Sequence, residues 1–261
     1  MTPSITPPPG LRARYLLRIA DTCLIHAQRL GEWCGHGPIL EEDMALTNMS
    51  LDLIGQARAL LTHVGQSAPQ KLDEDQLAFL REERDYLNMT LAELPGRQAG
   101  RDFADAVLRN LMLGQWLLLL WQRLQASSDA EVAAIAAKAV KEARYHVEHA
   151  ADWVVRLGDG TAESARRMAQ ALGRLWPYAG ELFDADEADA EAAATGLGPS
   201  RAELRADWQA AMAKVLAEAQ LAAPKDTAFR ATASRGVHSE HLGYMLAEMQ
   251  HLQRAYPGGR W

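Results

Sequence analysis

The sequence is short of several features, and each shortage excludes a class of protein. Lysine and arginine number 27 against 34 aspartate and glutamate, a net charge of −7, which lacks the basic excess that a nucleic-acid partner needs. The longest apolar run, residues 111–121, is far shorter than the ~20 residues that cross a bilayer. No basic-then-apolar signal opens the chain. We therefore expect a cytoplasmic protein that binds neither nucleic acid nor a membrane.

Cysteine is also scarce, because the chain contains only Cys23 and Cys34, both expected on the first helix. At ~1.5 Å of rise per residue the two would lie roughly 16 Å apart, which is too far for a disulfide bond. Two free thiols fit a reducing compartment such as the cytosol.

Aromatic residues make up 7% of the chain, while Ala and Leu are abundant, and this composition favours helix over strand. No stretch keeps the alternation of a half-buried strand for long. Long helices are expected at residues 11–33, 40–64 and 102–126 and between "SSDAEV" and "LGDG", with further helical pieces at residues 73–94, from Thr161 with a kink at Pro177, and at residues 200–222 and 238–255. Long helices joined by short turns predict an all-α antiparallel bundle, one domain over residues 10–261 after a disordered arm at 1–9.

The stretch "KAVKEARYHVEHAADWVVRLGDG", residues 138–160, resembles one quarter of a di-iron site. Such bundles place Glu and His three residues apart on a helix, but here Ala143 precedes His146. Leu53 and Gln56 form the equivalent pair on the second long helix. A rotation of ~100° per residue places His146 and Gln56 at the edge of their apolar stripes, still able to point inward, and Gln28 on the inward side of the first helix.

The residue types at these positions argue against iron. A di-iron bundle needs a carboxylate from each of two helices and Glu-x-x-His from each of the other two. Leu and Ala offer no donor atom, and Gln is a poor neutral one, whereas buried iron needs anionic oxygen donors. The sequence therefore predicts no metal site, no cofactor and no catalytic residue in this chain.

Several segments together are distinctive: "AQRLGEWCGHGP", "SLDLIGQARALL", "KEARYHVEHAADWVVRLG", "ELFDADE" and "HSEHLGYMLAEMQHLQR". The combination resembles the C subunits of bacterial phenylacetyl-CoA epoxidases, multicomponent monooxygenases of phenylacetate breakdown, from the first helix to the C-terminus. The resemblance implies a ferritin-like antiparallel four-helix bundle with additional C-terminal helices. It also implies pairing with a related A subunit, whose di-iron ligands correspond to positions that here hold Gln28, Leu53, Gln56, Leu113, Ala143 and His146.

The resemblance further implies a structural, non-catalytic subunit that scaffolds the di-iron A subunit, with accessory and reductase subunits completing the enzyme. That enzyme inserts one oxygen atom into the ring of phenylacetyl-CoA to give the 1,2-epoxide. We expect a homodimer when the chain is alone and a heteromeric assembly with the partner. The first three long helices are the favoured interfaces because of their apolar excess.

Two other functions stay open from the sequence. One is an independent di-metal oxygenase or ferroxidase with non-standard ligands, and the other is a small-molecule binding module in the vacated space between Gln28, Gln56 and His146. Glu142, His146 and His149 could share a zinc ion, but polar contacts at a helix face are favoured, with His146 hydrogen-bonded in the core.

Two further polar segments could each bind a metal ion or have a structural role. His238 and His241 also have metal-like spacing, yet capping or an interface role is favoured for them. The segment "FDADEADAE", residues 183–191, lacks the Gly and Glu of a calcium loop, so a solvated acidic turn is expected.

Overall fold

A computed structural model describes residues 2–96, 101–225 and 227–259, and all regular structure in these ranges is helical. The α-helices are α1 (Leu11–Gly31), α2 (Leu40–Ser67), α3 (Glu74–Phe79), α4 (Thr90–Glu93), α5 (Phe103–Leu124), α6 (Ala130–Gly158), α7 (Ala162–Leu175), α8 (Glu187–Thr195), α9 (Arg205–Glu218), α10 (Glu240–Met249) and α11 (His251–Ala255). The 3₁₀-helices are η1 (Glu83–Asp85), η2 (Trp176–Phe183), η3 (Arg201–Leu204) and η4 (Ala233–Arg235). The prediction of an all-α protein is confirmed.

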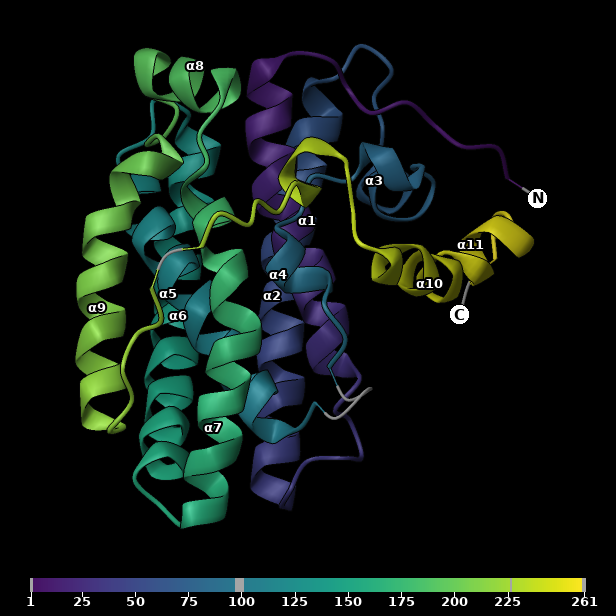
Figure 1. Ribbon diagram of the computed structural model, residues 1–261. Helices are drawn as coiled ribbons and strands as arrows, with labels where there is room; N and C mark the ends of the chain where they lie inside the picture. Colours follow the sequence, from purple (N-terminus) through teal and green to yellow (C-terminus); the bar gives the residue numbers. More distant parts are fainter. Residues whose placement is uncertain (1, 97–100, 226, 260–261) are drawn as a thin grey trace.

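The four long helices α1, α2, α5 and α6 form the ferritin-like bundle expected from the sequence (Figure 1). Short connections make antiparallel hairpins of α1 with α2 and of α5 with α6, and α2 packs against α6. The long segment 68–102 carries α3, η1 and α4 from the first hairpin to the second. One long crossover between two hairpins is the topology of ferritin-like bundles.

Side-chain caps mark where the two helices of the second hairpin begin. The Asp102 side chain accepts a hydrogen bond from Ala104 N (2.9 Å) at the start of α5. Asp129, in the segment "SSDAEV" where the next long helix is expected to begin, accepts from Glu131 N (2.9 Å) at the start of α6. Each acceptor satisfies a backbone donor that the first helical turn leaves free. Thr161, where a helix is expected to begin, caps α7, because its hydroxyl accepts from Ser164 N.

Helix α5 runs through the middle of the protein. It is the described helix long and apolar enough to cross a membrane by length and composition, and 89% of its apolar window is buried inside the protein. Trp116 and Trp121 on this helix are both fully buried, as expected for core packing. The apolar character of α5 on nearly every face thus matches a helix surrounded by its own chain.

The remaining helices cover the bundle on two sides. Helices α7 and α9 pack on α5 and α6, while α10 and α11 lie on the opposite side of the molecule (Figure 1). Pro177 ends α7 two residues earlier, at Leu175, and η2 follows, so the expected kink is instead a change of helix type. The helix expected at 238–255 is divided at Gln250 into α10 and α11.

Residues 2–9 form no helix or strand, but they contact the body of the protein. Thr2 N donates to Arg254 O (2.9 Å) and Ile5 N donates to Leu80 O (2.9 Å). The segment expected to be a disordered arm therefore has backbone partners on α11 and at the end of α3.

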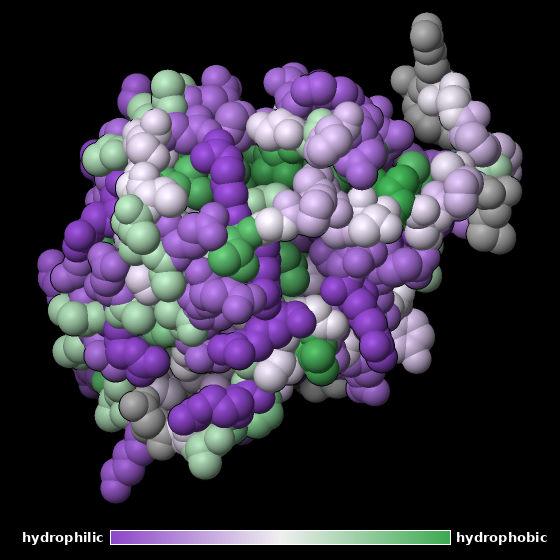
Figure 2. All heavy atoms as spheres, turned by 90° about the horizontal axis from the view of Figure 1, so that it is seen from above, coloured by the Kyte–Doolittle hydropathy of each residue, from purple (hydrophilic) through white to green (hydrophobic). Residues whose placement is uncertain are grey.

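The end of the bundle seen from above is mainly hydrophilic (Figure 2). Its hydrophobic spheres occur in small separate groups, so this view shows no broad apolar face.

Candidate functional site

The bundle interior is the place where the sequence predicts a lost di-iron centre. Of the six positions, Leu53, Leu113, Ala143, Gln56 and His146 are buried, whereas Gln28 is half-buried. Leu53, Leu113 and Ala143 contribute only hydrocarbon. The polar chemistry of this region therefore comes from Gln56 and His146 and from the residues that contact them.

Gln56 joins three helices by hydrogen bonds. Its Oε1 accepts from Cys23 Sγ on α1 at 3.7 Å, and its Nε2 donates to Glu142 Oε2 on α6 at 3.0 Å. The other Glu142 oxygen, Oε1, lies 3.5 Å from Lys138 Nζ, on the solvent side. Both ends of the amide are thus engaged by other protein groups, and neither end is left for a metal.

His146 pairs with a carboxylate at the seam between α2 and α6. Its Nε2 lies 3.0 Å from Asp52 Oδ2, and one turn further along α6 His149 Nε2 lies 2.7 Å from Glu42 Oε2. An ionised carboxylate only accepts, so each ring donates. The interpretation of Glu142 and His149 as polar contacts at a helix face, with His146 hydrogen-bonded, is confirmed.

His26 and Asn110 form a second buried polar contact between bundle helices, which was not predicted from the sequence. His26 Nε2 lies 3.2 Å from Asn110 Oδ1, and Asn110 Nδ2 lies 3.1 Å from Met49 Sδ. We call the buried set of Cys23, His26, Gln56, Asn110 and His146 the central polar cluster. The spacing of Cys23 and His26, three residues apart on an apolar helix, was the one available signal, and it does not reveal their partners on α2 and α5.

Burial keeps the central polar cluster uncharged. It lowers the pKa of His26 to about 3, with the positive charge of Arg109 adding to the effect. Burial also lowers the pKa of His146, although the hydrogen bond to Asp52 opposes this. The pKa of the Cys23 thiol is raised by burial, so the nucleophilic thiolate is not formed at neutral pH. The cluster therefore offers neutral donors and acceptors and no activated nucleophile.

This electrostatic state predicts a pH dependence of stability. Because the folded pKa of His26 lies below the unfolded value of about 6.5, the unfolded chain binds the extra proton first as pH falls. Stability from neutral His26 is thus full above pH 6.5 and is lost from there toward pH 3. The unfolding free energy of the wild type should therefore fall between pH 7 and pH 5, and His26 should account for about 2 kcal/mol of that fall. In His26→Gln, which lacks the titrating ring, we expect the fall to be smaller by this amount.

Urea unfolding at a series of pH values measures this effect. His36→Gln, at an exposed histidine, is the control and should leave the pH dependence of the wild type unchanged. Parallel curves for wild type and His26→Gln would contradict a neutral buried imidazole.

The residues present do not fit a di-iron group. Leu53, Leu113 and Ala143 have no donor, and Gln56 is already bonded at both ends. Asp52 and Glu142 are partly exposed and are hydrogen-bonded to His146 and Gln56 respectively. Within the residues that the structure describes, no three His, Cys, Asp or Glu side chains come together as metal ligands.

The second histidine motif has a structural role. His238 Nδ1 lies 2.8 Å from Glu93 Oε2, and its Nε2 lies 2.9 Å from Tyr86 O. Both ring nitrogens face acceptors, which is the pattern of a protonated ring. Burial opposes this charge, but the hydrogen bond and charge of Glu93 raise the pKa of His238. Ser239 caps α10 by accepting from His241 N (3.4 Å), so the interpretation of this motif as a cap is confirmed.

The acidic segment 183–191 is not the solvated turn that the sequence predicts. Asp186 caps the unexpected helix α8, and Asp189 is fully buried. Arg18 of α1 binds both, at 2.6 Å to Asp186 Oδ2 and 3.1 Å to Asp189 Oδ2, and Arg201 also binds Asp189 at 3.1 Å. These ion pairs join α8 and the first residue of η3 to α1 of the bundle.

Comparison with known proteins gives two agreeing matches. A family profile described as "Phenylacetic acid catabolic protein" matches residues 10–261. The chain is also 47% identical over 247 residues to the C subunit of 1,2-phenylacetyl-CoA epoxidase from Escherichia coli (strain K12), a match that covers 95% of this chain and 98% of that relative.

Proposed function

Since the chain belongs to the phenylacetic acid catabolic protein family, we propose that it is a structural, non-catalytic subunit of a phenylacetyl-CoA 1,2-epoxidase. Its role would be to hold the di-iron catalytic A subunit in the assembled enzyme. The similarity to the C subunit of such an epoxidase over almost the whole of both chains supports membership in a multisubunit enzyme of this kind.

The observation that carries the non-catalytic role is the donor set of the bundle interior. Leu53, Leu113 and Ala143 bury hydrocarbon at three of the six positions compared with the iron subunit. Gln56 and His146 satisfy their hydrogen bonds with residues of this chain. Apolar packing avoids the free-energy cost of burying unpaired carboxylates, and it leaves a stiff bundle. This donor set gives no support to an independent di-metal oxygenase.

The proposal includes the rest of the assembly. The di-iron cofactor belongs to the A subunit, none is expected in this chain, and accessory and reductase subunits complete the enzyme in the cytoplasm. Alone, the chain should form a homodimer. One continuous set of buried side chains reaches from α1 to α10, which supports a single domain over residues 10–261.

Helix α2 presents the best surface for the iron subunit. Helices α1 and α5 are almost wholly buried within the chain, whereas Leu40, Met44 and Leu51 of α2 are 72%, 57% and 60% exposed. These three residues fall within about 40° on the helix surface, and we call them the α2 stripe. Apolar side chains clustered on one face commonly mark a protein interface.

One experiment tests the scaffold role with two contrasting variants. Leu51→Arg, in the α2 stripe, should weaken copurification of the A subunit at least tenfold, because it places a charge where an apolar side chain would be covered. Epoxidation of phenylacetyl-CoA by the reconstituted enzyme should fall in proportion. His146→Ala, inside the bundle, should leave both assembly and turnover largely intact.

Leu252→Arg, at another exposed apolar residue on α11, is the matched control and should assemble normally. The thermal stability of isolated Leu51→Arg should equal that of the wild type, since surface substitutions usually change it little. Loss of turnover in His146→Ala with assembly preserved would overturn the non-catalytic role.

A further inference from the structure

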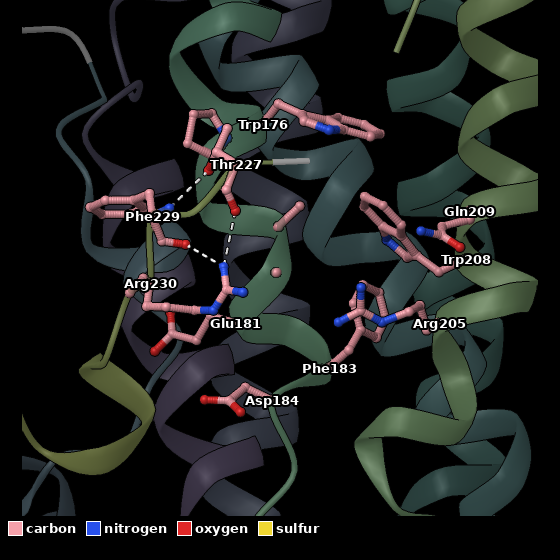
Figure 3. A pocket seen from close by; sticks show the side chains of 14 residues that line it. Trp176, Glu181, Phe183, Asp184, Arg205, Trp208, Gln209, Thr227, Phe229 and Arg230 are labelled. Atoms are coloured by element: carbon pink, nitrogen blue, oxygen red, sulfur yellow. Dashed lines mark hydrogen bonds between the residues drawn. The ribbon is translucent and has the colours of Figure 1, made fainter. Parts of the chain in front are cut away.

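A cavity of about 260 Å³ lies outside the bundle interior, between η2, the start of α9 and residues 227–231. In Figure 3 Phe229 and Arg230 lie on one side of it, and Trp208, Gln209 and Arg205 lie on the other. Phe229 and Arg230 belong to the long connection between α9 and η4. One wall of the cavity thus comes from a segment that is distant from η2 in the sequence. Nothing in the scaffold role requires such a cavity.

Aromatic rings form much of its wall. The ring centroid of Trp208 lies 5.5 Å from that of Trp176 and 5.3 Å from that of Phe183, and Phe229 packs edge-on against Tyr178 at 5.1 Å. Trp208 Nε1 also donates to Met112 O of α5 at 2.9 Å, which fixes the indole to the bundle core. Trp208 is 1% exposed and is held between Trp176 and Phe183, so it supports the wall from behind. The rings that a ligand can reach are the half-buried Trp176 and the exposed Phe229, which are in place before a ligand arrives.

Two arginines at the cavity have no carboxylate partner among the described residues. The Arg205 guanidinium lies over the Phe183 ring, 5.1 Å from its centroid. Arg230 uses one nitrogen, Nη1, for the carbonyls of Thr227 (3.0 Å) and Phe229 (2.9 Å), as Figure 3 shows. No ion pair joins either guanidinium to an acidic side chain in the described ranges, so both charges are available to an anion.

The acidic residues of the wall are already engaged by the protein. Glu181 accepts from Thr90 N at 2.7 Å and from Ser234 N at 2.8 Å. Asp184 pairs with Arg235 at 2.8 Å. Glu181 has backbone donors but no ion pair among the described residues, so Arg205, Arg230 and Arg235 against Glu181 and Asp184 leave one positive charge in excess at the cavity.

We propose that this cavity binds a small aromatic carboxylate, with the ring between Trp176 and Phe229 and the carboxylate on Arg230 and Arg205. An apolar cavity of about 150 Å³ accommodates a benzene ring, so 260 Å³ holds one ring and a short acidic arm. Larger ligands usually need about 300 Å³ or more. Guanidinium groups bind carboxylates through paired, charge-assisted hydrogen bonds, which gives the ligand its orientation.

Gly180 provides a way to block the cavity without disturbing the fold. It lines the cavity, and a Cβ placed on it meets no atom within 4 Å. Gly173 on α7 has the same open surroundings but lies outside the cavity lining, so it serves as the matched control. Gly180→Leu should fill the space, and Gly173→Leu should not.

The test is isothermal titration of the full chain with phenylacetate as the probe, alongside Trp fluorescence. Saturable binding with a dissociation constant below about 1 mM is expected, an ordinary affinity for one ring and one charge. Arg230→Gln and Gly180→Leu should each weaken it at least tenfold, and Gly173→Leu should bind as the wild type does. The amine 2-phenylethylamine, which carries the opposite charge, should bind at least tenfold more weakly than phenylacetate.

Absence of saturable binding up to about 10 mM phenylacetate would overturn the proposal, as would equal binding by wild type and Gly180→Leu. Preference for the amine would overturn the assignment of an anion. The titration uses the isolated chain, so its result is separate from that of the assembly experiment on the α2 stripe.

Discussion

Replacing Arg81 by Ala is expected to lower the free energy of unfolding by about 3–5 kcal/mol. Arg81 and Asp21 are both fully buried, and Arg81 Nη1 lies 3.0 Å from Asp21 Oδ2. Asp21 also accepts from Leu87 N (2.9 Å), while Arg81 donates to the carbonyls of Leu77 (2.5 Å) and Asp85 (2.9 Å). Removing the guanidinium leaves a buried carboxylate with its charge unpaired and two carbonyls without their donor.

This pair matters because it holds the long crossover, residues 68–102, against α1. Asp21→Asn keeps the shape of the side chain and should give a smaller loss than Arg81→Ala, since the amide can still accept hydrogen bonds. The matched control is Arg58→Ala. Arg58 forms an ion pair with Glu74 (3.0 Å), but its side chain is 72% exposed. That change should cost less than about 1 kcal/mol.

Urea unfolding of the isolated chain, followed by far-ultraviolet circular dichroism, measures all three variants. The midpoint should fall for Arg81→Ala and stay near the wild type for Arg58→Ala, with the slope unchanged if two-state unfolding is kept. Similar midpoints for these two variants would show that the buried pair does not stabilise the crossover as argued.

The helices that the sequence predicts best are those with strong local signals. The expected start and end of α1, α2 and α5 lie within a few residues of those in the structure, because an apolar period acts over neighbouring residues, and a side-chain cap also marks the start of α5. Helix α8 was missed for the opposite reason. The neighbouring sequence indicates that its acidic residues are exposed to solvent. In the structure Asp189 is buried against Arg18, which lies about 170 positions away in the chain. A charge is recognised as buried only when its distant partner is known.

The same distinction applies to the bundle interior. A rotation of ~100° per residue placed Gln56 and His146 at the edge of the core, and both are buried in the structure, where His146 has the hydrogen bond expected for it. The rotation rule acts on one helix at a time, however. It does not reveal that His26 meets Asn110 of α5, since that contact depends on how two helices are staggered against each other.

Leu53→Glu is expected to destabilise the protein by about 4 kcal/mol or more. The substitution restores the carboxylate of a Glu-x-x-His motif at one of the six positions, where the Leu53 side chain is 1% exposed. Burial without a cationic partner shifts a carboxyl pKa upward by about 3 units or more, which corresponds to roughly 4 kcal/mol at neutral pH. The neighbouring positions still offer Leu113 and Ala143, so the new carboxylate has no second anionic ligand with which to share a metal.

Urea unfolding of Leu53→Glu with and without Fe(II) under anaerobic conditions measures both parts of this expectation. A ligand that binds only the folded state raises stability in proportion to the logarithm of its concentration, so a formed site would give an Fe(II)-dependent midpoint. We expect the same low midpoint with and without Fe(II), and an unchanged wild type. Leu53→Met, which nearly conserves volume, is the control and should cost less than about 1.5 kcal/mol. Stabilisation of Leu53→Glu by Fe(II) would mean that the remaining residues still form most of a metal site, and it would remove the physical basis for a non-catalytic bundle.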